Sequence, residues 1–360
     1  MVGALSLLAC GSAELPSFDA VGEVVGSGKN DLWWRTQEAG TNPSLPNYFL
    51  MHRVDGADQK IPQPEILRTS RGIASAGPGT IWVFAAPEVR SLAALKIDGS
   101  GTVISDRTAD FETFMPGDNY ASMSLRSGNG GVAFTVGTTK GVRLYRFDGE
   151  KFVAMTVPPA LGSVGPVRVL GLDDIWFGRE NNELVHYKDG AWTEVPGSTN
   201  PSLPLSFDAT GTVAWSVEGI FEYEGPYTEG VPAHTFVNLQ RIENHVATKL
   251  RLEFPPNEQN GYGLFAAIAR PNGKYALLLG RERGISTFES WVVARSGDAN
   301  AVGKVDTTLH YYGDTCTARC QSMGTVLNLL EDGTFLLNAG LRTDHGGQTW
   351  VLVGGQANLP

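Results

Sequence analysis

Charged side chains gather in loops that each follow a strand with a central aromatic residue. The segments AAPEVRS, GRENNE, GRERGIS and AGLRTDHGG carry them, and the residues are Arg90, Arg179, Glu180, Arg281, Arg283, Arg342, Asp344 and His345. Guanidinium groups bind carboxylates and phosphates through paired hydrogen bonds, and carboxylates accept hydrogen bonds from hydroxyl groups. The pattern predicts a surface that binds an anion or a carbohydrate. A solvated rim of mixed charge is the alternative.

A second kind of chemistry available to the same loops is glycan cleavage. Glycosidases place two carboxyl groups about 5–10 Å apart across the scissile bond. The carboxylates that could form such a pair are Glu180, Glu218, Glu282 and Asp344. The chain contains no GxSxG, HExxH, P-loop or EF-hand motif, so we expect no cofactor or metal. The favoured function is a non-enzymatic binding or scaffold module, and a glycan-active hydrolase or lyase is the alternative.

The composition indicates an all-β protein. Of the 360 residues, 42% are hydrophobic and only 18% are charged, with 44 Gly and 20 Pro. This turn-rich mixture lacks the Ala, Glu, Lys and Leu enrichment of helical proteins. The formal net charge is −10, whereas nucleic-acid-binding proteins normally present a basic face. We therefore expect no nucleic-acid partner.

An internal repeat organises the chain. Its clearest copy runs from Leu172 to Pro196, with turns at Asp173-Asp174 and Asp189-Gly190. Degenerate copies recur roughly 40 to 60 residues apart. The aromatic residues at their shared central position are Trp33, Trp82, Phe134, Trp176, Trp215, Tyr275 and Phe335. Long repeats with several short strands are typical of β-propeller blades. The sequence predicts one propeller of seven four-stranded blades, with six or eight as alternatives.

The clearest copy also predicts the strand order within a blade. Its inner strand A is Val167–Leu172, strand B is Asp174–Arg179, strand C is Glu183–Gly190 and outer strand D is Ala191–Pro196. The last blade has material for only three strands. We expect the segment Ala13–Val25 to supply the fourth strand and close the ring, which removes an exposed sheet edge.

Several recurring residues have a structural interpretation. Trp33, Trp82, Trp176 and Trp215 share one blade position and are predicted to pack between adjacent sheets, while Trp34 is out of register and points the other way. His52 and His186 share one strand-C position, which favours a scaffold role over metal binding. Hairpin turns are predicted at Asp55-Gly56, Asp98-Gly99, Asp148-Gly149 and Asp189-Gly190.

The segment RTDHGGQTW, residues 342–350, resembles the Asp-box of sialidase-like and related propellers. Thr343, Gly347, Thr349 and Trp350 match that signature, but His345 stands where the turn-capping aspartate belongs. In that family the box is structural. The chain has no Arg-Ile-Pro motif, so the resemblance implies no sialidase activity.

The N-terminal residues MVGALSLLAC resemble the lipobox of bacterial lipoproteins. The resemblance implies a signal peptide over residues 1–9, lipidation at Cys10, a tether over 10–12 and a propeller domain over 13–360. The apolar run is short and no Lys or Arg precedes it, which a start codon placed too far downstream would explain. Export would favour a disulfide between Cys316 and Cys320, with a metal clip or two free thiols as alternatives.

Residues 20–355 as a whole resemble the bacterial cell-envelope β-propeller lipoproteins, whose blades carry a D-[IV]-W-x-x-G … L-x-[HY]-x-D-G-x-x-W repeat. The resemblance implies an exported binding or assembly platform, lipid-anchored on the periplasmic side or at the cell surface. Its partner would be an envelope protein or a glycan. A third option, a redox propeller holding a quinone, lacks a cofactor-docking repeat. The blade pattern is least legible over residues 223–270, which form either a blade or an insertion.

Overall fold

The computed structural model spans residues 1–360. It describes residues 17–20, 24–37, 48–62, 64–65, 70–88, 90–199, 205–208, 210–224, 234–253, 262–269, 275–282, 288–295, 306–311, 327–330, 334–342 and 348–355. Cys10, Cys316 and Cys320 lie outside these ranges, as do Arg283, Asp344 and His345. Across the described ranges, no helix has the length and apolar character needed to cross a membrane.

The described strands form seven four-stranded antiparallel sheets. Sheet one contains β2 (Val24–Gly28), β3 (Asp31–Gln37), β4 (Tyr48–Val54) and β5 (Ala57–Ile61). Sheet two contains β6 (Ser70–Ser75), β7 (Thr80–Ala85), β8 (Ala93–Asp98) and β9 (Val103–Asp106). Sheet three contains β10 (Tyr120–Gly128), β11 (Gly131–Thr138), β12 (Gly141–Phe147) and β13 (Phe152–Ala154). Sheet four contains β14 (Val164–Gly171), β15 (Asp174–Arg179), β16 (Leu184–Lys188) and β17 (Ala191–Val195).

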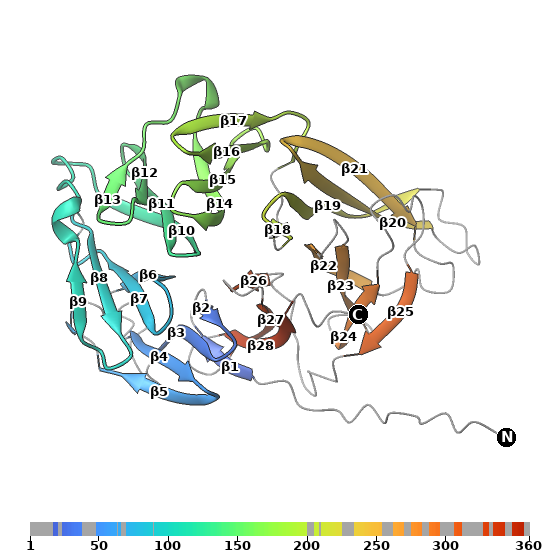
Figure 1. Ribbon diagram of the computed structural model, residues 1–360, viewed down its shortest axis with the longest axis horizontal. Helices are drawn as coiled ribbons and strands as arrows, with labels where there is room; N and C mark the ends of the chain where they lie inside the picture. The colour runs from blue at the N-terminus through green and yellow to red at the C-terminus, as the bar shows by residue number, and fades with distance from the viewer. Residues whose placement is uncertain are drawn as a thin grey trace.

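The remaining sheets repeat the same order. Sheet five contains β18 (Ser206–Phe207), β19 (Val213–Glu224), β20 (His234–Glu243) and β21 (Val246–Glu253). Sheet six contains β22 (Tyr262–Ala269), β23 (Tyr275–Glu282), β24 (Phe288–Arg295) and β25 (Asp306–Tyr311). Sheet seven contains β26 (Leu327–Leu329), β27 (Thr334–Arg342), β28 (Gln348–Gly355) and β1 (Ser17–Ala20). The sheets surround a common centre (Figure 1). The strands nearest that centre are β2, β6, β10, β14, β18, β22 and β26.

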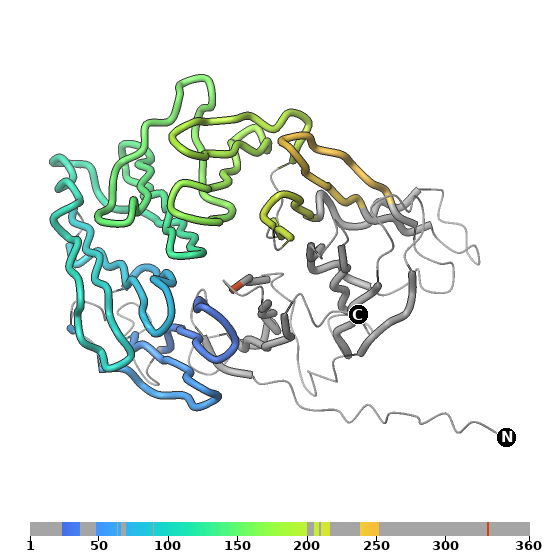
Figure 2. The backbone as a smooth tube through the Cα atoms, in the orientation of Figure 1, coloured from blue at the N-terminus to red at the C-terminus, as the bar shows by residue number. Residues whose placement is uncertain are grey.

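The predicted all-β propeller and its four-stranded blade are confirmed, and the first and last strands of the chain pair as expected. β1 pairs antiparallel with β28, with Ser17 opposite Val351 and Ala20 opposite Gln348. The N-terminal strand therefore provides the outer strand of the last sheet (Figure 1). Figure 2 shows the backbone of sheets one to four following one another in chain order around part of the ring. Residues 234–253, in the segment where the repeat was least legible, form the outer half of sheet five.

Tight hairpin turns connect neighbouring strands within the sheets. Asp55 and Gly56 have φ values of 50° and 84°, and Asp189 and Gly190 have φ values of 49° and 83°. Positive φ at both central residues defines the type I′ turn that matches the twist of a hairpin. Asp98 acts differently, because its Oδ1 accepts hydrogen bonds from the backbone N–H groups two and four residues later, at 2.9 and 3.0 Å.

The recurring tryptophans pack between adjacent sheets, as predicted. Trp82 of sheet two is 2% exposed and contacts the rings of Phe147 and Phe152 in sheet three. Trp176 of sheet four contacts the ring of Phe207 in sheet five. Trp34 is buried in a different cluster, with Leu330 of the last sheet, which confirms that it points the other way. Each interface buries aromatic area that holds neighbouring sheets together.

One polar cluster links sheet one to sheet two. The sheet-one cluster consists of Asp31, Trp33 and His52, and the His52 ring stacks on Trp33 with centroids 3.7 Å apart. The Asp31 carboxylate accepts hydrogen bonds from Ser27 Oγ (2.6 Å), Trp33 Nε1 (3.1 Å) and His52 Nε2 (2.7 Å). The N–H of Gly79, in the turn between β6 and β7 of sheet two, donates a fourth bond at 2.9 Å. The carboxylate therefore ties two sheets together.

A matching cluster lies at the same place in sheet four. The sheet-four cluster consists of Asp174, Trp176 and His186, and the His186 ring stacks on Trp176 with centroids 4.3 Å apart. Asp174 interacts with His186 Nε2 and Lys188 Nζ, each at 2.8 Å. His186 Nδ1 lies 2.7 Å from Nε2 of His245, at the turn between β20 and β21 of sheet five. The predicted scaffold role of the strand-C histidines agrees with these contacts.

Candidate functional site

The strand topology places three of the predicted residues at one face of the ring. Three predicted arginines lie at or next to the C-terminal end of a strand: Arg179 in β15, Arg281 in β23 and Arg342 in β27. Each of these strands is the neighbour of the innermost strand of its sheet. The C-terminal ends of these strands lie at one face, which we call the B–C face. The connections 107–119 and 155–163, which join sheet two to sheet three and sheet three to sheet four, lie on this face too. Glu218 and Glu282 lie within β19 and β23, so they are strand residues rather than loop residues.

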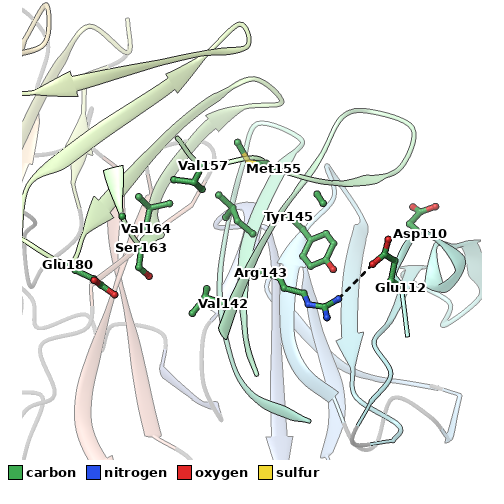
Figure 3. Close-up of a pocket in the computed structure, with 13 residues that line it drawn as sticks. Asp110, Glu112, Val142, Arg143, Tyr145, Met155, Val157, Ser163, Val164 and Glu180 are labelled. Carbon is green, nitrogen blue, oxygen red and sulfur yellow. Dashed lines mark ion pairs between the residues drawn. The ribbon is translucent and has the colours of Figure 1, made fainter. Parts of the chain in front are cut away.

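A cavity opens on this face between sheets three and four, and we call it the rim pocket (Figure 3). Its volume is about 860 Å³. Its lining residues come from three places: the connection before β10, strands β12 and β13 with the segment after them, and the start of sheet four with its B–C loop. They are Asp110, Glu112, Val142, Arg143, Leu144, Tyr145, Ala154, Met155, Val157, Gly162, Ser163, Val164 and Glu180.

Two connections on the B–C face build the walls of the rim pocket. Residues 107–119 join sheet two to sheet three and begin with the short 3-10 helix η2 (Thr108–Asp110). Phe114 of this connection is buried, and its N–H donates to the carbonyl of Arg90 at 2.9 Å. Asp110 Oδ2 accepts the N–H of Phe152 at 2.8 Å. These contacts fix the connection against sheets two and three, so the pocket has a defined shape.

The polar wall of the pocket centres on Arg143 of β12. Its Nη2 donates to Asp118 Oδ2 at 3.1 Å, its Nη1 lies 3.9 Å from Glu112 Oε2, and its guanidinium lies over the ring of Phe114. The hydrogen bond from Thr138 lowers the pKa of Asp118 most, and the contacts with Arg143 and Lys140 lower it further against the opposing effect of burial. Asp118 stays ionised, so it holds Arg143 in place. Glu112 is 90% exposed and is available to a ligand.

Figure 3 shows Glu180 and Ser163 across the pocket from Arg143, Glu112 and Asp110. Glu180 is exposed, and its N–H donates to the carbonyl of Ser163 at 3.3 Å. Apolar side chains of Met155 and Val157 lie between the two polar walls (Figure 3). The described lining holds three carboxylates against one guanidinium, an excess of negative charge. The pocket is therefore suited to hydroxyl groups and apolar ring faces better than to an anion.

Arg179, predicted as a binding residue, holds the protein's own backbone. Its Nε donates to Leu161 O at 3.0 Å and its Nη2 to Ala160 O at 3.1 Å, both in or next to the short helix η3 (Pro159–Leu161). Its Nη1 also bonds Glu183 and Glu194, at 3.2 and 3.3 Å. These bonds position the segment that leads into Gly162 and Ser163. In this structure Arg179 shapes the pocket wall.

Of the other predicted residues, Arg90 is exposed at the border of this region, and Glu180 lines the pocket itself. The backbones of Arg281 and Arg342 lie on the same face in sheets six and seven, away from the rim pocket. Sequence reasoning missed Asp110, Glu112 and Arg143. The signal that could have found them is the length of the connections 107–119 and 155–163, which open on the same face as the B–C loops.

Within the described part of the chain, no group of three or more His, Cys, Asp or Glu side chains is arranged to hold a metal ion. His52 and His186 are committed to aspartate and tryptophan partners. Neither histidine faces the rim pocket.

No protein-family model matches this chain, and no curated protein matches it. Solved structures that resemble it include a GH74 xyloglucanase from Xanthomonas campestris, at 13% sequence identity and a TM-score of 0.49, covering 95% of this chain and 56% of that chain. A Trypanosoma rangeli sialidase in complex with the inhibitor DANA has 11% identity and a TM-score of 0.42, with the same coverage of 95% and 56%.

The SapL1 lectin in complex with alpha methyl fucoside has 10% identity and a TM-score of 0.34, covering 83% of this chain and 96% of the lectin. These names include two glycan-processing enzymes and a sugar-binding protein. At such identities and TM-scores none of them assigns an activity to this chain. Its propeller fold is defined by its own strand pairing.

Proposed function

We propose that this chain is a non-enzymatic binding propeller that holds a glycan of the bacterial envelope in its rim pocket. The observation that carries the proposal is a preformed cavity on the B–C face in which apolar side chains lie between two polar walls. Sugar rings present apolar C–H faces and a periphery of hydroxyl groups. Met155 and Val157 offer the apolar surface, and Glu112, Ser163 and Glu180 offer hydrogen-bonding groups.

The preformed shape of the pocket supports a binding role. Arg143 is fixed by Asp118, and Arg179 fixes the opposite wall through two backbone carbonyls. A site whose side chains are already held loses little conformational entropy when a ligand binds. Glu112 and Glu180 are the exposed groups that remain for the ligand.

We further propose that the propeller is exported and anchored by a lipid on Cys10, and that Cys316 and Cys320 form a disulfide. The lipobox-like N-terminus and the even number of remaining cysteines support this location. An anchored propeller would present its B–C face to envelope glycans. Mass spectrometry of peptides from protein extracted from intact cells tests both points, because acylation adds mass to the peptide that carries Cys10, and a disulfide removes the two thiol hydrogens from the peptide that carries Cys316 and Cys320.

A glycan-active enzyme is the second candidate, because the rim pocket holds acidic side chains on opposite walls (Figure 3). Glu112 lies on one wall and Glu180 on the other, the general arrangement that an acid and a base or nucleophile require. This reading predicts turnover, whereas the binding reading predicts a stable complex.

One experiment separates the two candidates. Purified protein is applied to an immobilised panel of neutral and acidic envelope glycans, and both retention and released products are measured. We expect retention of a neutral glycan without cleavage. The double substitution Glu112→Gln and Glu180→Gln should weaken retention at least about tenfold, since two hydrogen-bond acceptors with charge are lost.

Glu150→Gln is the matched control, because Glu150 is exposed on the β12–β13 turn and does not line the rim pocket. Release of a product that the double variant no longer makes would establish the enzyme instead. Equal retention by the wild type, the double variant and the control would remove the rim pocket from the proposal.

A further inference from the structure

Negative charge exceeds positive charge at the rim pocket. Asp110, Glu112 and Glu180 line it, and the guanidinium of Arg143 is the single cationic group of its described lining. Arg143 is already matched, because the ionised carboxylate of Asp118 accepts a hydrogen bond from its Nη2 at 3.1 Å. The three lining carboxylates therefore face the cavity without an equal positive charge.

Two cations beside the pocket have partners of their own. Arg179 holds the wall that leads into Ser163, but its Nη1 lies 3.2 Å from Glu183 and 3.3 Å from Glu194. The exposed Lys140 does not line the pocket, and its Nζ donates to the carbonyl of Pro116 at 3.1 Å. The excess of negative charge inside the pocket is therefore left for a ligand to offset.

The lining carboxylates differ in what they already bind. Asp110 Oδ2 accepts the N–H of Phe152 at 2.8 Å, so this side chain is part of the wall. Glu112 is 90% exposed, and it lies 3.9 Å from Arg143 Nη1, too far for a hydrogen bond. The exposed side chain of Glu180 makes no hydrogen bond or ion pair with another described residue. Glu112 and Glu180, on opposite walls, are therefore available to a ligand (Figure 3).

A mostly buried hydroxyl group also belongs to this pocket. Tyr145 lines the pocket and is only 5% exposed, and its ring packs on Phe134 and Phe111 with centroids 5.3 and 5.4 Å away. Its hydroxyl makes no hydrogen bond within the described part of the chain. Figure 3 shows Tyr145 on the same side of the pocket as Arg143 and Glu112. Because burial limits access to water, a ligand that bonds this hydroxyl gains a contact that solvent supplies poorly.

We propose that the rim pocket recognises an amino sugar, a glycan ring that carries a protonated amine. An ammonium group donates three hydrogen bonds and accepts none, which matches two carboxylates and a hydroxyl oxygen without a partner. Glu112 and Tyr145 lie on one side and Glu180 on the other, with Met155 and Val157 between them for the apolar face of the ring. This inference rests on the proposed glycan binding and names the class of glycan.

The test compares two tetrasaccharides with the same linkage, one built from glucosamine and one from glucose. They differ only in an amine or a hydroxyl group on each ring, so their lengths and apolar faces match. Both are titrated calorimetrically into the purified chain at low ionic strength and about pH 6, where such an amine is protonated. We expect the glucosamine tetramer to bind at least about tenfold more tightly. Salt at about 0.5 M should reduce this preference, because it screens exposed charges.

The ratio of the two affinities reports charge recognition separately from binding itself. Glu112→Gln and Glu180→Gln should each lower the ratio about threefold, and the double variant should bring it close to one, because each carboxylate contributes part of the attraction. Glu150→Gln is the matched control and should keep the wild-type ratio, because Glu150 is exposed on the β12–β13 turn and does not line the pocket.

Tyr145→Phe tests the contact with the buried hydroxyl. The substitution keeps the ring that packs on Phe134, so this variant is expected to fold, and thermal unfolding checks that it does. Both tetramers should bind about three- to fivefold more weakly with their ratio little changed, because ligand amines and hydroxyls can both bond this group. Wild-type affinity for both tetramers in a folded Tyr145→Phe would overturn the role of this hydroxyl.

The remaining outcomes separate this inference from the proposed function. Equal affinity of the wild type for the two tetramers, weakened in the double variant, would overturn the amino-sugar preference and leave glycan binding at the rim pocket intact. A ratio that falls as far in Glu150→Gln would overturn it too, since any acidic surface group would then act alike. No saturable binding of either tetramer would also overturn it, and retention on the glycan panel would still decide whether the pocket binds another glycan.

Discussion

The sheet-one and sheet-four clusters contain the same three residue types in the same register but couple to their neighbours differently. In both, the histidine lies directly across from the tryptophan on the adjacent strand and stacks on its ring. Asp31 reaches the next sheet itself, through the N–H of Gly79. In sheet four the histidine makes that contact, through His245. One repeat thus produces two kinds of link between sheets.

The difference follows from the atoms that surround each aspartate. Asp31 collects Ser27 Oγ, Trp33 Nε1 and His52 Nε2 as well as the Gly79 N–H. Burial raises the pKa of Asp31, but these hydrogen bonds outweigh burial and lower the pKa to about 2. The repeat therefore specifies the stacked cluster, while residues outside the repeat determine which side chain of the cluster contacts the next sheet.

Within sheet four, Trp176 Nε1 is buried without a hydrogen-bond partner among the described residues. Asp174 has His186 and Lys188 as its partners instead. Burial raises the pKa of Asp174 and its two hydrogen-bonded partners lower it, with a net shift below the ordinary value. The carboxylate supports the histidine, and the histidine joins the sheets.

The largest expected effect comes from removing each carboxylate in turn. Asp31→Ala leaves four donors without their acceptor, and we expect it to lower the free energy of unfolding by about 3 kcal/mol. Asp174→Ala removes two interactions, one to a mostly exposed lysine, and should cost about 1–2 kcal/mol. Urea denaturation of both variants measures the difference. Equal losses would mean that the two clusters contribute alike and that the link to Gly79 adds no stability.

The repeat made much of the fold predictable from local signals. Period-two alternation, Asp-Gly turns and a central aromatic residue act within a few residues, so the four strands of sheet four matched their predicted positions closely. Closure by the N-terminal segment was predictable because the last repeat had material for only three strands. The atoms that link neighbouring sheets were not predictable, because these contacts join residues about 50 positions apart in the sequence.

The candidate sites were predictable only in part. Glu180 was correctly placed on the face where the rim pocket opens. Arg143 was missed because it lies within a strand, where alternation says which face it takes but not which loop packs over it. The packing of a connection over a strand of the next sheet is a property of the ring, not of any one repeat.

The second prediction uses pH to separate the two clusters. Burial lowers the pKa of His245, and the nearby His186 and Lys188 lower it further against the opposing charge of Asp174. The unfolded chain binds a proton at His245 more readily, so stability should fall as pH drops through the ordinary value of 6.5. The effect should stay below about 1 kcal/mol, because His245 is only partly buried. The contribution of Asp31 should persist until pH falls below about 3.8, and be lost toward its folded pKa of about 2.

Thermal unfolding between about pH 7.5 and 5 measures this dependence in the wild type and in His245→Gln. The variant should have a flatter profile over that interval. Val246→Thr is the control, because Val246 is 63% exposed in the same turn region and does not titrate. An unchanged slope in His245→Gln would show that the contact between sheets four and five is not a source of pH dependence.

The smallest expected effect lies at Lys188, which is 57% exposed and pairs with Asp174. Its hydrogen bond to Asp174 raises the pKa of Lys188, but exposure limits the stabilisation, so Lys188→Gln should cost only about 0.3 kcal/mol. The sharper measurement is an NMR titration of His245. Since the positive charge of Lys188 lowers the pKa of His245, removing that charge should move this pKa up toward its ordinary value. A His245 titration unchanged in Lys188→Gln would mean that the charge of Lys188 does not affect His245, and that burial and the nearby His186 account for the lowered pKa.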